Sequence, residues 1–329
     1  MRVTRDILIN LARENAAKLA AKDRGLVCVY LVGSLVRDRE PFIGGVTDID
    51  LVCVHDRPIA ARREIIRINA DVHLDIAHYT QEEYAPARKL RLDPWIGGAL
   101  ELEAVSLQDS THWFDLTRST AISQFWQPAN VAARCRVLLT SARQNWQSLV
   151  DGSVPQGIKR TRVFLDAIRE TANTVAVFSG MPLTVRRLFM DLPESAARAE
   201  LPEITGNLVE LFTSEKVTDE QFSLWLDGLG SVFETLKQSQ TVPPSIHPNR
   251  RNYFEKAILA MTEERPAAAV WLLLDVWTMA ASTFPRTEEP HKAWLTFCQE
   301  LGLDNKTLTS RLDGLDAALD QVEEAVDSL

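Results

Sequence analysis

The stretch Val29-Tyr-Leu-Val-Gly-Ser34, followed after a polar segment by Thr47-Asp-Ile-Asp-Leu-Val-Cys-Val54, decides the fold of this chain. Each apolar run is typical of a buried strand. Side chains two residues apart in a strand point to the same face, so Asp48 and Asp50 place two carboxylates side by side at a strand edge. The segment between the two strands contains Pro41 and two glycines, which predicts a loop.

The residue types at these strand ends indicate a particular chemistry. Two adjacent carboxylates repel each other, and a divalent cation is the usual partner that relieves the repulsion. Mg²⁺ prefers carboxylate oxygens together with the phosphate oxygens of a substrate. Gly33 lets the backbone approach a phosphate closely, and the hydroxyl of Ser34 can donate a hydrogen bond to it. The pattern therefore predicts a metal–nucleotide site.

A strand that ends in Gly-Ser, followed by a hydrophobic-Asp-x-Asp-hydrophobic segment, resembles the nucleotidyltransferases related to DNA polymerase beta. The resemblance covers roughly Leu26 to Tyr79, with a longer spacer after Ser34 than many relatives have. It implies a small mixed sheet with three carboxylates, which hold two Mg²⁺ ions and position a nucleoside triphosphate for attack on its α-phosphate. We expect Asp75, in an alternating strand-like run, to be the third carboxylate; Asp71 and Glu103 stay open as alternatives.

The chain divides into two parts of different character. A length of 329 residues suggests two domains. We predict an α+β fold, with a small mixed-sheet nucleotidyltransferase domain over residues 1–120 and an all-α domain over 121–329. The segment 60–68 reads as a helix, and 100–107 reads as the last strand of the first domain. The expected helices of the second part cover 128–150, 158–179, 183–190, 204–213 and 219–237. Two or three further helices are expected to fill 253–283, 292–301 and 305–328.

The arrangement of a small catalytic domain and a helical domain is similar to that of aminoglycoside nucleotidyltransferases. In such proteins the helical domain holds the acceptor and sometimes contacts the triphosphate. Lys159, with Arg160 and Arg162 in the same turn, could neutralise charge on the leaving pyrophosphate. The alternative is that all three are ordinary solvated residues on a helix.

These observations lead to one function hypothesis and two alternatives. The hypothesis is a magnesium-dependent transfer of AMP from ATP to a hydroxyl of a small, aminoglycoside-like acceptor. Asp48 and Asp50 would bind the ions with Asp75, which also helps to deprotonate the acceptor, while Gly33 and Ser34 hold the β- or γ-phosphate. The alternatives are modification of a protein side chain and a non-catalytic nucleotide-binding regulator.

Composition restricts the partners. The net charge of −9 argues against nucleic acid as a partner, because such binding relies on Lys and Arg neutralising phosphates. Four cysteines without metal-ligand spacing argue against a zinc site and a disulfide framework and predict a cytoplasmic protein. Cys28 and Cys53 lie in the predicted core strands, and we expect them to be small buried apolar residues. Residues 1–22 lack the apolar core of a signal peptide, and no apolar run is long enough to span a bilayer. A homodimer is expected by analogy with relatives that share a site between subunits.

Overall fold

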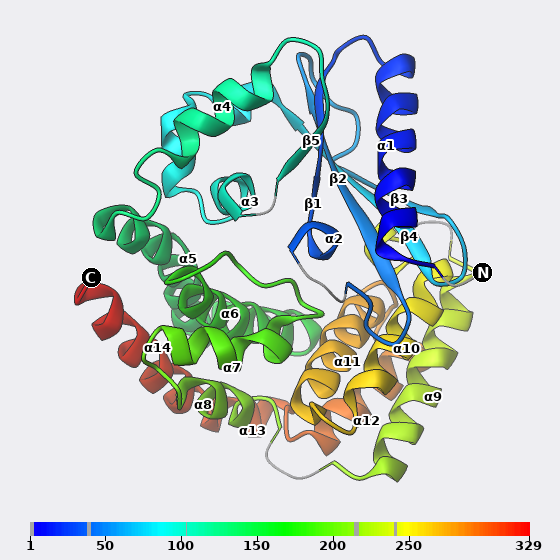
Figure 1. Ribbon diagram of the computed structural model, residues 1–329. Coiled ribbons are helices and arrows are strands. Elements are labelled where there is room, and N and C mark those ends of the chain that lie inside the picture. The colour runs from blue at the N-terminus through cyan, green and yellow to red at the C-terminus, as the bar shows by residue number, and fades with distance from the viewer. Residues whose placement is uncertain (1–2, 38–40, 103, 214–216, 240–241) are drawn as a thin grey trace. The chain divides into compact units, whose positions relative to one another are not determined.

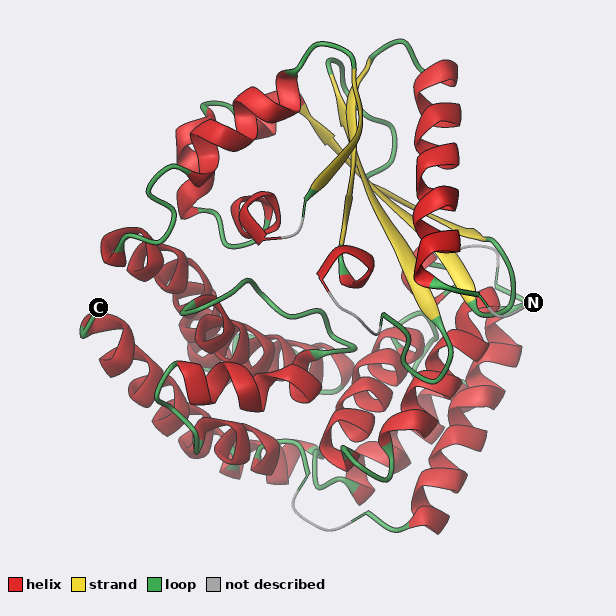
Figure 2. Ribbon diagram, in the orientation of Figure 1, coloured by secondary structure: helices red, strands yellow, loops and turns green. Residues whose placement is uncertain are grey.

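The computed structural model describes residues 3–37, 41–102, 104–213, 217–239 and 242–329. The chain forms two compact units, residues 1–131 and 132–329, and each is described by itself. In the described residues every strand belongs to the first unit and the second unit is helical, as Figure 2 shows. The predicted α+β fold class, with a mixed sheet followed by an all-helical region, is therefore confirmed.

The first unit is a five-stranded sheet with helices on its faces (Figure 1). Its elements are α1 (Arg5–Lys22), β1 (Leu26–Val32), α2 (Ser34–Arg37), β2 (Thr47–His55), β3 (Arg63–Arg67), β4 (Val72–Thr80), the short turns η1 (Gln81–Tyr84) and η2 (Ala87–Leu92), α3 (Ile96–Leu102), β5 (Val105–Asp109) and α4 (Trp113–Ile122). The strand order is β3-β4-β2-β1-β5. β2 and β4 are parallel and the other neighbours are antiparallel, so the sheet is mixed.

Alternation along the strands divides the core of this unit between the two faces of the sheet. Ile49, Leu51 and Cys53 of β2 pack against α1, whose Leu8, Ala12 and Ala16 are fully buried. The side chains between them on β2 point to the opposite face, where α3 and α4 supply Leu100, Phe114 and Ala121. Figure 1 shows α1 on one side of the sheet and α3 and α4 on the other. Asp50 and Asp48 precede Val52 on β2 by two and four residues, so all three side chains point to the same face of the sheet. This is the face that α3 and α4 cover.

Two local predictions for the first unit are wrong. The segment 60–68, expected as a helix, contains strand β3, which pairs antiparallel with β4 at the sheet edge. Its side chains are exposed apart from the half-buried Ile65, so the strand buries too few residues to show a clear period. The strand expected over 100–107 is also displaced: α3 continues to Leu102, and β5 covers Val105–Asp109.

The second unit is a bundle of helices. They are α5 (Pro128–Val150, which begins in the first unit), α6 (Ile158–Val177), α7 (Leu188–Arg198), α8 (Ile204–Glu210), α9 (Asp219–Leu236), α10 (Arg251–Met261), α11 (Pro266–Ala281), α12 (Glu289–Glu300), α13 (Asn305–Ser310) and α14 (Leu312–Asp327), with short turns η3 (Pro244–Ile246) and η4 (Pro248–Arg250). Most expected helices are present, but α7 begins at Leu188 rather than at residue 183, and the segment 253–283 is two helices separated at Pro266.

Helix α11 is the centre of the second unit. Thirteen of its residues are buried, and it packs against α6, α7, α9, α10 and α12. The ring of Trp277 stacks on Phe297 at 4.6 Å, and the indole of Trp294 donates to Thr278 Oγ1 at 3.0 Å. A helix that is apolar on all sides must be surrounded, which explains why neighbouring helices cover it.

Two properties of the whole chain bear on the sequence predictions. All four cysteines lie in the described ranges, and each is a buried free thiol, which confirms the burial predicted for Cys28 and Cys53. Among the described helices, none combines the length and the apolar composition that crossing a bilayer requires.

Candidate metal centre

Three aspartates from two parallel neighbouring strands converge on one face of the sheet. In the β2–β4 ladder, Asp50 is the direct partner of Asp75, and Asp48 precedes Asp50 by two residues on the same face. One carboxylate oxygen from each aspartate lies within 4.8 Å of those from the other two. Within the described ranges of the chain, no other cluster of three or more His, Cys, Asp or Glu side chains meets this condition.

The aspartates are largely withdrawn from water. Asp48 is 7% and Asp75 is 5% exposed, whereas Asp50 is half-buried. Burying like charges together is costly unless cations compensate them, because water no longer screens their repulsion. The cluster is therefore a set of hard oxygen ligands that requires positive charge, which is the donor chemistry that Mg²⁺ prefers.

Among the described residues, the guanidinium of Arg63, at the start of β3, is a cation that pairs with this cluster. Its Nε donates to Oδ1 of Asp75 at 2.7 Å, and a terminal nitrogen donates to Oδ2 at 2.5 Å. This two-point pairing raises the pKa of Arg63, first through the hydrogen bond to Asp75 and further through the charges of Asp75, Asp50 and Asp48. The guanidinium thus supplies one positive charge to the three carboxylates.

Gly33 makes room for the Asp50 carboxylate. The residue follows β1, whose Val32 pairs with Asp50, and it has a φ of 81°. A Cβ built on Gly33 would lie 2.9 Å from Cγ of Asp50 and would clash with Oδ2. The glycine is therefore required both by its backbone conformation and by the space that Asp50 fills. Its contact with a nucleotide phosphate stays a prediction.

Ser34 and Lys159 are the other two residues that we expected to contact a nucleotide. Ser34 is buried and begins the short helix α2 directly after Gly33. Lys159 is exposed in the first turn of α6, in the second unit. Its neighbour Arg162 pairs with Asp275 within that unit, at 3.0 Å. The phosphate-binding roles of Ser34 and Lys159 stay predictions.

Of the two alternatives to Asp75, the structure describes Asp71 but not Glu103. Asp71 precedes β4, and its carbonyl accepts a hydrogen bond from the Thr47 amide at 3.0 Å; its carboxylate does not belong to the cluster of three. Glu103 lies outside the described residues. The position of Asp75 follows from the ladder, because it pairs with Asp50 itself.

Two further residues at the cluster carried no assigned role in the sequence analysis. His73 is the ladder partner of Asp48; it is 1% exposed, and its Nδ1 lies 3.9 Å from Oδ1 of Asp48. Arg63 was missed because its segment was interpreted as a helix, which would place it away from the sheet. The signal that could have located it is the β-branched pair Ile65 and Ile66, which favours a strand.

A second polar cluster lies on the opposite, α1-facing side of the sheet. Nε2 of His55 and Nδ1 of His78 are 2.9 Å apart, and Nδ1 of His55 lies 3.3 Å from Asp23. Nε2 of His78 lies 3.8 Å from Glu64. Burial is the largest influence on His78 and lowers its pKa, while Glu64 acts in the opposite direction. This cluster is separate from the aspartates, because His78 and Asp75 have opposite parity on β4.

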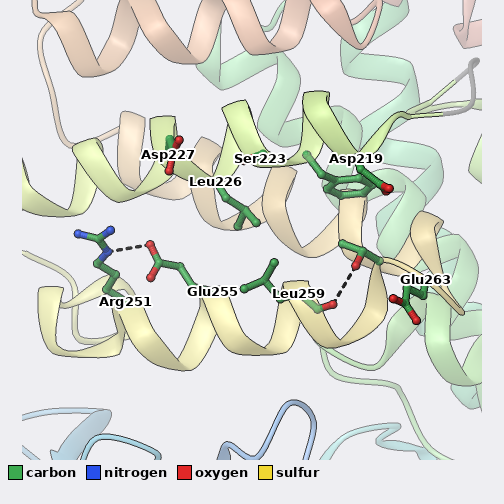
Figure 3. A pocket seen from close by; sticks show the side chains of 10 residues that line it. Asp219, Ser223, Leu226, Asp227, Arg251, Glu255, Leu259 and Glu263 are labelled. Carbon is green, nitrogen blue, oxygen red and sulfur yellow. Dashed lines mark hydrogen bonds and ion pairs between the residues drawn. The ribbon is translucent and has the colours of Figure 1, made fainter.

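The second unit contains a groove between α9 and α10, shown in Figure 3. Its volume is about 470 Å³. Leu226 and Leu259 line its middle, and its charged residues are Asp219, Asp227, Glu255, Glu263 and Arg251. Arg251 Nε donates to Glu255 at 2.7 Å. Four carboxylates against one guanidinium give the groove an acidic lining.

Comparison with known proteins does not assign this chain to a family. No protein-family model matches the chain. No curated protein matches it either. One solved structure that matches is that of a nucleotidyltransferase-like protein from Exiguobacterium sibiricum, with 11% sequence identity over 96% of this chain and 91% of that chain. The TM-score of 0.33 is too low for this likeness to carry an argument about fold or function.

Proposed function

We propose that this chain is a nucleotidyltransferase that uses Mg²⁺ to move AMP from ATP to a hydroxyl of a small cationic acceptor. The observation that carries the proposal is the convergence of Asp48, Asp50 and Asp75 on one face of the sheet. Such a set of carboxylates fits two Mg²⁺ ions, which would complete their shells with the phosphate oxygens of the triphosphate. The resemblance of the Gly-Ser and Asp-x-Asp segments to nucleotidyltransferases points to the same chemistry.

Each carboxylate has a distinct task in this proposal. Asp48 and Asp50, adjacent on β2, would hold the ions that carry the triphosphate, and Asp75 would complete the second site. Bound divalent ions supply charge stabilisation to the attacking oxygen and to the leaving pyrophosphate. Asp75 would also receive the proton of the acceptor hydroxyl at one carboxylate oxygen. Both of its oxygens are bound to Arg63, so this role requires Arg63 to release one of them.

The class of acceptor is proposed from charge. The chain carries a net charge of −9, and the groove between α9 and α10 has an acidic lining with an apolar middle. Such a lining favours a small molecule with amino groups, as an aminoglycoside has, over an anionic acceptor. A protein side chain as the acceptor is the outcome to examine if small molecules fail.

One specific observation favours a second candidate function. The bidentate pair between Arg63 and Asp75 gives the third carboxylate a partner inside the protein. A site in which Asp75 stays bound to Arg63 would keep only two carboxylates for metal. The second candidate is therefore a non-catalytic regulator that binds nucleotide through Asp48 and Asp50 without transferring it.

The decisive experiment measures pyrophosphate release from each of the four ribonucleoside triphosphates with Mg²⁺, across a panel of acceptors that includes aminoglycosides. The proteins are the wild type, the Asp48→Ala/Asp50→Ala variant and an Asp71→Asn control, whose carboxylate lies outside the cluster. Acceptor-dependent release that the double variant loses and the control retains supports the enzyme. Mg²⁺-dependent nucleotide binding without any release, with the panel extended to protein acceptors, supports the regulator instead.

A further inference from the structure

Arg63 occupies the position of a cation at the aspartate cluster. Its two hydrogen bonds engage both oxygens of Asp75, and its charge forms an ion pair with that carboxylate. Asp75 is almost fully buried, so water would not replace these hydrogen bonds if the guanidinium moved away. In the metal-free protein Arg63 therefore relieves the repulsion that three clustered carboxylates create.

The pairing limits what Asp75 can offer to a metal ion. Each of its two oxygens accepts a hydrogen bond from Arg63, and the guanidinium places a positive charge beside the carboxylate. If Arg63 leaves Asp75, this charge is removed and the two bonds no longer compete with a metal ion.

The arginine is also placed so that it can leave. Its side chain is 55% exposed, and it projects from β3, the edge strand of the sheet, whose outer residues are open to solvent. The guanidinium can therefore exchange the carboxylate for water by rotation of its long side chain, without movement of the strand. Arg67, four residues later on the same strand, is also exposed, and its Nε donates to the Asn69 carbonyl.

We propose that Arg63 is a resident counter-ion of this site, which competes with a divalent cation for Asp75 and is displaced when the metal binds. The proposal rests on the proposed function in one respect, namely that the three aspartates bind metal. It goes further in assigning to Arg63 the control of metal affinity. The opposite role is that of an orienting partner that holds Asp75 in place for the metal, as hydrogen-bonded neighbours of metal ligands commonly do.

The two roles predict opposite effects on metal affinity. A competitor weakens metal binding, so Arg63→Ala should bind Mn²⁺ more tightly, by at least about tenfold. An orienting partner strengthens it, and its loss typically weakens binding by about 10- to 100-fold. Arg63→Lys keeps the charge without the two-point fork, so we expect an affinity between those of the wild type and Arg63→Ala.

The control is Arg62→Ala. Arg62 is the neighbour of Arg63 in the chain and carries the same charge, but its guanidinium pairs with Glu83 at 2.6 Å. Its removal changes the net charge by the same amount without freeing Asp75. We therefore expect Mn²⁺ affinity close to that of the wild type, which separates competition at Asp75 from a general effect of charge.

The experiment is titration of the metal-free full chain with Mn²⁺, without nucleotide, by calorimetry and by the signal of free Mn²⁺ in electron paramagnetic resonance. Circular dichroism verifies that each variant is folded. Tighter binding by Arg63→Ala than by both the wild type and Arg62→Ala supports the proposal, as does binding that appears only when Arg63 is removed. Equal or weaker binding by Arg63→Ala overturns it.

An Asp50→Asn variant separates this inference from the proposed function. Wild-type binding of Mn²⁺ that is lost in Asp50→Asn, with no gain in Arg63→Ala, overturns the role of Arg63 and leaves the metal site intact. Absence of Mn²⁺ binding in the wild type and in Arg63→Ala alike overturns both. A thermal shift on adding Mn²⁺ provides the second readout, and it should be larger for Arg63→Ala than for the wild type.

Discussion

The missing side chain of Gly33 is the space that the Asp50 carboxylate occupies. A Cβ on Gly33 would lie 2.9 Å from Cγ of Asp50, and the φ of Gly33 is 81°. The end of β1 and the first half of β2 thus fit together through one glycine and one aspartate, because Gly33 directly follows Val32, the ladder partner of Asp50. This relationship ties a backbone feature to the geometry of the candidate metal centre.

Gly33→Ala should therefore impair metal binding as well as stability. The left-handed backbone alone costs about 1–2 kcal/mol for a residue with a side chain, and the clash displaces Asp50 in addition. Gly45→Ala is the matched control, because Gly45 has a φ of 78° with no atom within 4 Å of its Cβ position. We expect both variants to lose stability in urea unfolding, but only Gly33→Ala to lose Mn²⁺ affinity. Equal metal affinity in the two variants contradicts this account.

Asp50→Asn should reduce nucleotidyl transfer to the rate of the enzyme-free blank. The amide keeps the size of the side chain but removes one negative charge and one ligand oxygen from the cluster, so the ions are held less tightly. Pyrophosphate release with Mg²⁺ and a working acceptor measures the effect, and Asp71→Asn should retain activity. Substantial turnover by Asp50→Asn is incompatible with the proposed role of Asp50.

The burial of His78 should make the stability of the protein depend on pH. Burial lowers the pKa of His78 below its ordinary value of 6.5, so the folded state favours the neutral ring. The part of the free energy of unfolding that depends on a neutral His78 is therefore complete above about pH 6.5. It is lost as the pH falls through the lowered pKa, because the unfolded chain takes up the proton more readily. The charged groups facing it are Glu64, His55 and Asp23.

Urea unfolding at several pH values between 5 and 8 measures this dependence. We expect the free energy of unfolding to fall towards pH 5 in the wild type and to fall less steeply in His78→Gln. His112→Gln is the control, since His112 is exposed before α4 and should leave the slope unchanged. If His78→Gln leaves the pH dependence of the free energy of unfolding unchanged, groups other than His78 cause the loss of stability at acidic pH.

Removal of Arg162 should destabilise the helical unit. Asp275 lies on the central helix α11 with a side chain only 2% exposed, and Arg162 pairs with it at 3.0 Å. Arg162→Ala leaves a buried carboxylate without this partner, which costs about 3 kcal/mol. Arg198→Ala, which breaks an exposed pair with Glu194, should cost about 0.5 kcal/mol or less.

The same variant has a distinct pH signature. Burial raises the pKa of Asp275, so its protonated form is favoured in the fold, and loss of Arg162 removes the main opposing charge. The destabilisation of Arg162→Ala should therefore shrink as the pH falls, because the buried carboxylate can take up a proton. Addition of Asp275→Asn to Arg162→Ala should restore much of the stability at pH 7. A constant deficit at every pH contradicts this explanation.

The central strands were predictable because their local pattern is unambiguous. β1, β2 and β4 carry dense apolar runs, and the period of two places Asp48 and Asp50 on one face without knowledge of the neighbours. The edge strand β3 was not predictable from local pattern. Only Ile65 is half-buried while its neighbours on the strand are exposed, and the charged residues around it are compatible with a helix as well. The ladder register that sets Asp75 opposite Asp50 is a property of pairing, not of either segment.

The role of Arg63 illustrates what local pattern leaves out. Arg63, which Glu64 separates from the pair Ile65 and Ile66, has no feature that marks it as the partner of an aspartate 12 positions later in the chain. Only the antiparallel pairing of β3 with β4 brings the two together. The displaced start of α7 has a simpler cause, since the ends of helices depend on the contacts of their terminal turns.

The parallel ladder between β2 and β4 has a consequence for recognising distant relatives. Asp50 and Asp75 are neighbours because their strands pair, so the length of the connection between them is not fixed by the spacing of the carboxylates. Insertions or deletions in the connecting loops would leave the cluster unchanged as long as the ladder keeps its register. A search pattern with a fixed gap between the second and third aspartates will therefore overlook proteins that build the same cluster. A pattern that fixes only the position of each aspartate within its own strand will find them.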